Sequence, residues 1–147
     1  MIKIIIWLLL SILSGIAYRL GGIGKPFKSW MRDGICPLIA LVALWLLVGF
    51  KSSYWWAYLL TFGLMWGALS TYWRLDEKRW GYWAHGLGIS ISALPIIFIT
   101  GNWLGFIIRC IVLTGLITIV SKYITKDWLE EGLRGFLTIA TLPLLLI

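Results

Sequence analysis

Residues 103–120 are WLGFIIRCIVLTGLITIV, an apolar run of 18 residues that contains a single charge, Arg109. A helix that crosses a bilayer needs about 20 mostly apolar residues, with a range of about 17–25. Comparable runs occupy residues 2–18, 35–50, 54–73, 83–100 and 136–147, the last reaching 20 residues only when counted from Trp128. The sequence therefore predicts an all-α, polytopic transmembrane helical bundle of about six spans, the sixth full-length or ending inside the bilayer.

The composition agrees with a membrane protein. Hydrophobic residues make up 61% and charged residues 13% of the chain, whereas soluble domains are about 45–50% apolar and about 25% charged. A length of 147 residues suits one domain. We therefore expect residues 1–147 to form a single integral membrane domain.

The charges are confined to three short stretches. Residues 19–33, 74–79 and 122–134 hold all six carboxylates and ten of the thirteen basic side chains. If the apolar runs are spans, these stretches are loops one, three and five, and the positive-inside rule places them in the cytoplasm. The opposite loops carry only Lys51. This bias predicts a bacterial inner-membrane protein with both termini outside.

The net charge of +7 is explained by basic loops beside anionic lipid. Membrane lipids are thus the expected partners, and nucleic acid is not. The two cysteines, Cys36 and Cys110, form no CxxC pair and show no zinc-ligand spacing. No HExxH motif or cysteine cluster is present, so we expect neither a metal nor a cofactor.

The first charged loop combines glycine with basic residues in Arg19-Leu-Gly-Gly-Ile-Gly-Lys25. Glycine lets backbone amides approach a phosphate, and neighbouring cations supply charge. The loop lacks P-loop spacing, which makes a lipid phosphate a better candidate than a nucleotide, while a flexible basic loop without a ligand is the simpler alternative. The candidate anion-binding residues are Arg19, Lys25, Arg32 and Arg74.

Three side chains are candidate acid–base groups. His85, the sole histidine, begins the span at residues 83–100 beside glycines, and ionisable groups at a membrane boundary are functional candidates. Glu130 and Glu131 follow Asp127 in a segment where a helix N-cap, a capping box and an i,i+4 pair with Arg134 would also account for the charges. We predict that His85 lies near residues 127–134, giving a catalytic site of His85, Glu130 and Glu131.

Arg109 is the one charge deep within a span. A central arginine costs at least ~2.5 kcal/mol on insertion scales, so it should face protein or water. No carboxylate side chain is available at that depth. If the last helix begins near Gly135, we predict that the C-terminal carboxylate of Ile147 pairs with Arg109, together with the carbonyls and dipole of that helix end. If the helix begins at Asp127, carbonyls, water or a lipid phosphate must bind the guanidinium instead.

Small residues and prolines mark the helix contacts. The Gly63-x-x-x-Gly67 motif permits close helix approach, either within the chain or between copies of a homo-oligomer. Ser11-x-x-x-Gly15 offers a second contact of this kind. Pro95 and Pro143 lie within spans and should bend them.

Four motifs extend over most of the chain: Tyr18-Arg-Leu-Gly-Gly, Arg32-Asp-Gly, Trp80-Gly-Tyr-Trp-Ala-His-Gly and Glu130-Glu-Gly-Leu-Arg-Gly. Together they resemble uncharacterised small polytopic membrane proteins of tailed bacteriophages and their bacterial hosts. The resemblance implies a context and no activity. The layout of charged loops is also similar to that of membrane glycerol-phosphate acyltransferases, whose asparagine-rich first-loop motif is absent here.

Three functions are compatible with these patterns. The first is a polar site at the cytoplasmic face that binds an anionic lipid headgroup or a phosphorylated small molecule, with transfer chemistry as an extension. The second is an oligomeric channel or permeability factor of the phage lysis or exclusion type. The third is a structural membrane subunit.

Overall fold

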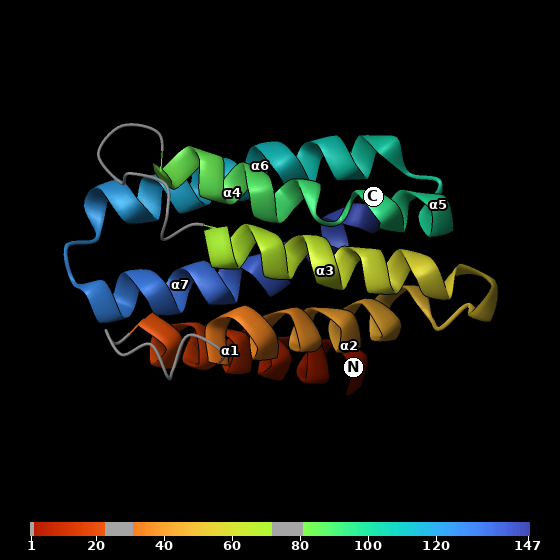
Figure 1. Ribbon diagram of the computed structural model, residues 1–147, viewed down its shortest axis with the longest axis horizontal. Coiled ribbons are helices and arrows are strands. Elements are labelled where there is room, and N and C mark those ends of the chain that lie inside the picture. The colour runs from red at the N-terminus through yellow and green to blue at the C-terminus, as the bar shows by residue number, and fades with distance from the viewer. Residues whose placement is uncertain (1, 23–30, 72–80) are drawn as a thin grey trace.

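The computed structural model describes residues 2–22, 31–71 and 81–147, and these residues form only helices, turns and short connections (Figure 1). The predicted all-α class is confirmed for this part of the chain. Three helical stretches, Ile2–Leu20, Trp83–Thr100 and Trp103–Tyr123, are long and apolar enough to cross a membrane, and Asp33–Val48 is a shorter apolar helix. In chain order the elements are α1 (Ile2–Gly22), η2 (Met31–Ile35), α2 (Cys36–Val48), η3 (Ser52–Tyr54), α3 (Trp55–Thr71), α4 (Gly81–Ile91), η5 (Leu94–Ile96), α5 (Ile97–Thr100), α6 (Trp103–Tyr123), α7 (Asp127–Ala140) and η6 (Leu142–Leu146).

The helices run roughly along one axis of an elongated bundle (Figure 1). One end of the bundle holds the C-terminal ends of α1, α3 and α6 and the starts of η2, α4 and α7. These helix ends flank the three charged stretches of the sequence. The connections from α2 to α3 and from α5 to α6 lie at the other end, together with Lys51. We call these the charged end and the bare end. Their segregation agrees with the charge pattern of the sequence.

Many large apolar side chains are exposed, and several polar side chains are buried beside an apolar core, unlike in a soluble domain. Large apolar side chains point outward on every long helix; the most exposed include Ile2, Leu59, Phe98, Leu104 and Ile111, each at least 58% exposed. The interior holds serine, threonine, histidine and arginine beside its leucine and isoleucine: Ser11, Ser14, Thr61, His85, Ser90, Ser92, Arg109, Arg134, Thr138 and Thr141 are all buried. An apolar exterior of this extent needs a cover.

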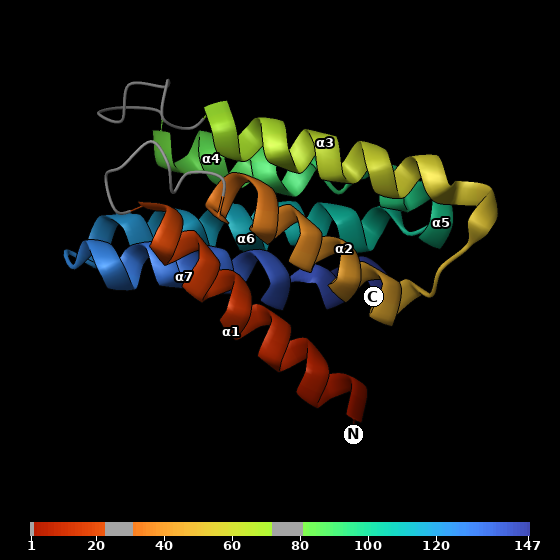
Figure 2. The same ribbon diagram turned by 60° about the horizontal axis from the view of Figure 1, so that its bottom comes forward.

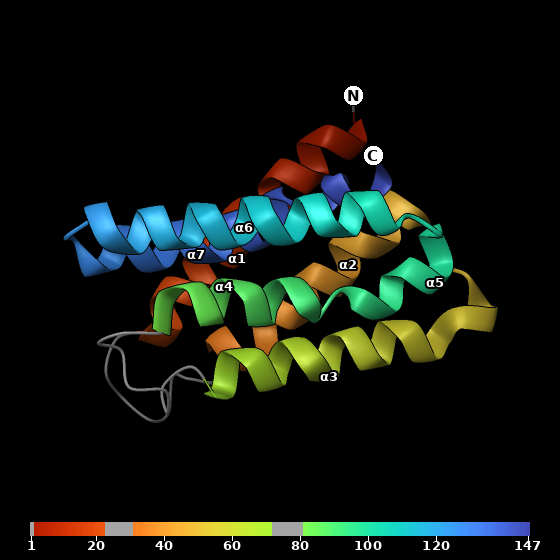
Figure 3. The same ribbon diagram turned by 90° about the horizontal axis from the view of Figure 1, so that it is seen from above.

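Two prolines interrupt the helices, as the sequence predicts. Helix α4 ends at Ile91, and the chain continues through the 3₁₀ turn at Pro95 into α5, between α3 and α6 (Figure 3). Helix α7 begins at Asp127, ends at Ala140 and gives way to 3₁₀ geometry around Pro143. Proline has no N–H to donate four residues back. The carbonyl of Ile139 instead accepts a hydrogen bond from the Trp7 indole at 3.1 Å.

Helices α1 and α7 cross at glycine. A Cβ added to Gly15 would lie 2.7 Å from the Gly132 carbonyl oxygen, and one on Gly135 would lie 2.5 Å from the Tyr18 Cβ. The close approach expected at Ser11-x-x-x-Gly15 is therefore confirmed for Gly15. Away from the crossing, the N-terminal half of α1 leans away from the other helices (Figure 2).

The other glycine motif is not used within the chain. Gly63 and Gly67 are exposed, and no atom of the described residues lies within 4 Å of a Cβ placed on either. The interpretation of this motif as a helix contact inside the chain is wrong, because the motif faces outward on α3.

Candidate functional site

His85 and Tyr18 form a buried pair near the charged end. The Tyr18 hydroxyl and the His85 Nε2 lie 2.5 Å apart, and the two side chains are only 2% and 3% exposed. Gly135 of α7 has no side chain at the place where the Tyr18 Cβ lies, so α1 can approach α7 closely at Tyr18. Gly86 lets α4 approach α6 so closely that a Cβ there would lie 2.9 Å from the Thr114 Cα. Four helices, α1, α4, α6 and α7, thus position this pair.

The pair can hold or pass a proton. If Nε2 is unprotonated, it accepts the hydrogen bond from the tyrosine hydroxyl; if it is protonated, it donates to the hydroxyl oxygen. Histidine is the side chain whose ordinary proton affinity suits acid–base work near neutral pH. Tyr18 begins the motif Tyr18-Arg-Leu-Gly-Gly, but the sequence gave no indication that its hydroxyl pairs with His85.

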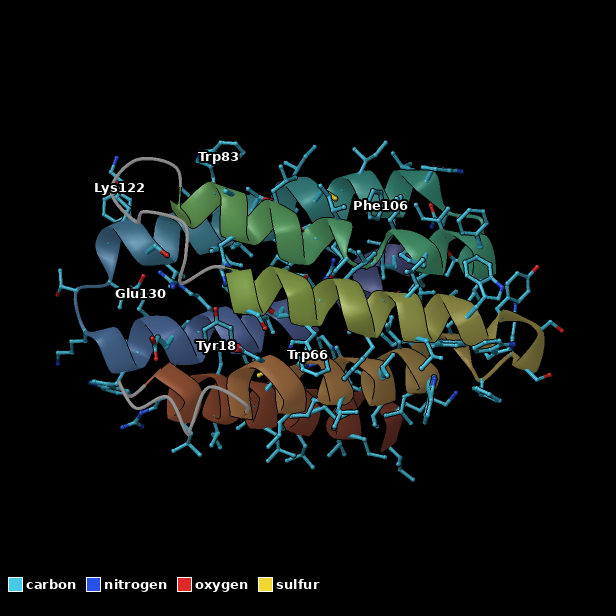
Figure 4. All side chains as sticks on the ribbon, viewed as in Figure 1. Tyr18, Trp66, Trp83, Phe106, Lys122 and Glu130 are labelled. Carbon is cyan, nitrogen blue, oxygen red and sulfur yellow. The ribbon has the colours of Figure 1, made fainter. Side chains whose placement is uncertain are left out.

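Glu130 lies on the same end of the bundle and pairs with Arg134 (Figure 4). Arg134 is 4% exposed and also donates from Nε and Nη2 to the Ser121 hydroxyl at 3.1 and 2.8 Å. The i,i+4 pairing was predicted. The alternative account of this segment, in which Asp127 is the helix N-cap, does not hold: Lys126 is the N-cap without a side-chain hydrogen bond, and α7 already begins at Asp127. Ser121 was not predicted, since a lone serine at a helix end has no distinctive spacing.

His85 and Glu130 do not share a hydrogen bond. The described partner of the Glu130 carboxylate is Arg134, while His85 is paired with Tyr18 on α1. Glu131 is half-buried on α7. The candidate acid–base residues therefore occupy one end of the bundle but divide into two groups, one centred on Tyr18 and one on Arg134.

The candidate anion-binding residues are only partly described. Arg19 is exposed, and its guanidinium lies 5.0 Å from the centre of the Trp128 ring, on the outside of the bundle. Adjacent positions on α1 thus send Tyr18 inward and Arg19 outward. Arg32 belongs to η2, but its side chain is not among those that the structure describes. Lys25 and Arg74 lie outside the described residues.

Arg109 is fully buried, as the cost of a charge in lipid predicts. It belongs to the inward stripe of α6 that also contains Phe106, Leu113 and Ile117. Its Nη1 donates to the Ser90 carbonyl oxygen at 3.1 Å, and its Nη2 donates to the Thr138 carbonyl oxygen at 3.3 Å. These carbonyls belong to the last turns of α4 and α7. Each helix C-terminus carries about −0.5 of an elementary charge, so the two ends together approximately balance the guanidinium.

The prediction that Ile147 pairs with Arg109 is wrong. Helix α7 begins at Asp127 rather than near Gly135, and Ile147 is 68% exposed. No ion pair joins Arg109 to a carboxylate in the part of the chain that the structure describes. The alternative, in which carbonyls answer the arginine, is the arrangement found. The acceptors lie at the ends of α4 and α7, whereas the prediction placed them at the end of the last helix beside Ile147.

No family model, no curated protein and no solved structure matches this chain. Within residues 2–22, 31–71 and 81–147, no three His, Cys, Asp or Glu side chains group as a metal site would require. Function is therefore inferred from the arrangement of the described side chains alone.

Proposed function

We propose that this chain is a multi-span membrane protein whose charged end recognises the phosphate of an anionic lipid headgroup or of a phosphorylated small molecule. The apolar exterior and the three helices of spanning length support the membrane location. The charge bias supports an inner membrane with the charged end in the cytoplasm.

The observation that carries the proposal is the buried polar group at that end. Tyr18, His85 and Arg134 are each at most 4% exposed, and they come from three different helices. A buried polar group costs folding free energy unless it is satisfied, and ionisable groups at a membrane boundary are functional candidates for that reason. The Tyr18–His85 pair would supply acid–base chemistry to a bound phosphate, a contribution of about 10²–10⁴ in rate where it operates.

Ligand-dependent stabilisation tests the recognition. The purified full chain in detergent is heated with phosphatidylglycerol, with glycerol 3-phosphate or with phosphatidylcholine, and its unfolding is followed by circular dichroism. We expect the phosphate-bearing anions to raise the melting temperature, since a ligand at 100 times its Kd adds about 2.7 kcal/mol. His85→Gln should reduce that gain, whereas Lys51→Gln at the bare end should leave it intact. Equal effects of anionic and zwitterionic lipid in the native chain would refute the proposal.

Transfer chemistry has its own test. Tyr18→Phe keeps the Cβ that lies beside Gly135 and the aromatic ring, and removes only the hydroxyl. We expect any release or transfer of phosphate from the bound molecule to fall while the ligand-dependent stabilisation persists. Unchanged turnover in this variant would leave recognition without catalysis by this pair.

A second function, an oligomeric channel, is favoured by one observation. Gly63 and Gly67 face outward with open space around them, as a contact between copies would require. Gly63→Leu tests this cleanly because no neighbour in the described structure would clash with the new side chain. Loss of a cross-linked oligomer in membranes, with monomer stability unchanged, would support the channel; an unchanged cross-linking pattern would oppose it.

A further inference from the structure

A shallow apolar groove runs along the outside of the α1–α7 crossing. It has a volume of about 240 Å³, below the ~300–1,000 Å³ of pockets that enclose whole ligands. It would therefore hold part of a chain-like molecule. Its apolar wall is formed by Ile12, Ile16, Leu129, Leu133 and Phe136.

One end of the groove is charged. Arg19 and Trp128 line it there, with the guanidinium held over the indole ring at 5.0 Å. Such a cation–π contact restrains an otherwise flexible arginine while leaving its N–H donors available. Arg19 is exposed and makes no hydrogen bond or ion pair to any residue that the structure describes. Its positive charge is therefore not neutralised by the described chain.

We propose that this groove is a phospholipid site, in which one acyl chain lies along α1 and α7 and the headgroup phosphate binds the Arg19 guanidinium. The inference deepens the proposed function by identifying the lipid, rather than a soluble phosphate, as the ligand at this face. Two features select an anionic phospholipid: the groove is apolar along its length, and the free donors of its one charged side chain match a phosphate. Tryptophan at the same level is typical of the headgroup region of a bilayer.

The groove lies outside the Tyr18–His85 pair although the residues are neighbours in sequence. Tyr18 is buried and Arg19 is exposed on the same helix turn. A lipid held by Arg19 would therefore place its phosphate beside the polar interior of the charged end. This position suits a lipid substrate waiting at the site as well as a permanently bound lipid.

Lipid retention by the full chain tests the inference. The protein is purified in detergent, incubated with equal amounts of phosphatidylglycerol and phosphatidylcholine, and examined by native mass spectrometry. One surface cation is worth about 1 kcal/mol toward an anionic lipid, which corresponds to about a fivefold preference. We expect this preference in the native chain and its loss in Arg19→Gln.

Matched variants separate the groove from general electrostatics. Lys122 lies 5.5 Å from the centre of the Tyr123 ring at the same end and lines no part of this groove, so Lys122→Gln should keep the preference. Leu129→Trp should fill the groove and lower the retention of both lipids, whereas Ile111→Trp, at an exposed position on α6, should not.

Three outcomes would overturn the site: an unchanged preference in Arg19→Gln, an equal loss in Lys122→Gln, or displacement of the lipid by excess glycerol 3-phosphate. The proposed function fails separately. It is tested by the loss of ligand-dependent stabilisation in His85→Gln, a substitution that leaves this groove intact. If His85→Gln lowers that stabilisation while Arg19→Gln leaves the lipid preference unchanged, the proposed function stands and the lipid site is refuted.

Discussion

At the scale of single residues, Arg109 is held without an acidic partner. A charge removed from water is ordinarily paired with an opposite charge. Here the partners are the carbonyls of Ser90 and Thr138, at the ends of two helices. Because both helices present the negative ends of their dipoles to one guanidinium, the backbone supplies the counter-charge. Arg109 therefore fastens α6 to α4 and α7 simultaneously.

We expect Arg109→Met to destabilise the protein. The substitution removes one donor from each of two carbonyls. The Ser90 carbonyl keeps the Ala93 N–H at 3.2 Å, whereas the described residues offer the Thr138 carbonyl no other donor. A buried polar group left unsatisfied costs about 1–3 kcal/mol. Arg109→Lys should fall between methionine and the native residue, since an ammonium keeps the charge but lacks the planar fork that reaches two acceptors. Thermal unfolding in detergent measures the order, with Ile111→Met as a control on the same helix. A methionine variant as stable as the native chain would contradict this account.

The Tyr18–His85 contact can be observed directly because the chain has one histidine. We expect the imidazole ¹⁵N resonances to shift in Tyr18→Phe, since Nε2 loses its partner at 2.5 Å. Tyr58→Phe is the control: its hydroxyl donates to the Gly49 carbonyl at the bare end, so the resonances should stay in place. Identical spectra for native and Tyr18→Phe chains would show that the hydrogen bond is absent in solution.

The sequence predicts a residue's location better than its partner. The inward position of Arg109 follows from the cost of a charge in lipid, and the Glu130–Arg134 pair follows from helical spacing. The acceptors for Arg109 could not be predicted, because every residue has a carbonyl. Pro95 and Pro143 were the only indication of where those acceptors lie, since a helix break leaves carbonyls without their helical donors. Nothing in the sequence indicated that Tyr18 is the partner of His85.

At the scale of elements, the crossing of α1 and α7 depends on the positions of glycines. Gly15 and Gly135 are closely approached by the opposite helix, whereas Gly63 and Gly67 in the more recognisable motif are open. A G-x-x-x-G spacing shows that one helix could be approached, but it does not identify the helix that approaches. That choice is made by the three-dimensional arrangement of all the helices.

Two neighbouring glycines of α7 should respond oppositely to alanine. In Gly135→Ala the new Cβ would lie 2.5 Å from the Tyr18 Cβ and 2.6 Å from the Ser14 carbonyl oxygen, so the helices must separate. Overpacking of this kind costs about 1–3 kcal/mol. In Gly132→Ala the nearest atom is 3.9 Å away, and helix propensity gains up to about 1 kcal/mol. Melting temperatures of the two variants check the contrast; equal losses would mean that the crossing is looser than described.

At the scale of the whole molecule, the bundle has a charged end and a bare end with an apolar surface between them. This layout was predictable, because segregated charge and long apolar runs are properties of the linear sequence. The packing order of the helices was not, since apolar runs of similar composition do not specify their neighbours. In the proposed membrane location, lipid would cover the apolar exterior and would leave packing specificity to the interior polar contacts, the glycines and the helix breaks.

The two ends should lie on opposite sides of the membrane. We expect single cysteines at Lys51 and Lys126, both exposed, to react with a membrane-impermeant maleimide from opposite faces, Lys126→Cys from the cytoplasm. The native thiols interfere little, because Cys36 is buried and Cys110 is partly buried within α6. Labelling of both positions from one face would reject the proposed topology.

The balance of Arg109 by two helix ends also constrains how the protein is made. In the proposed membrane location, α4 would already be present when α6 enters the bilayer during synthesis, but α7 would not yet have been translated. Until residue 138 follows, the guanidinium has only one of its two acceptors, and α1 has no glycine-lined partner at Gly15. The nascent chain thus carries an incompletely neutralised cation and an open first helix, a state that insertion machinery or quality-control proteases could distinguish from the finished bundle.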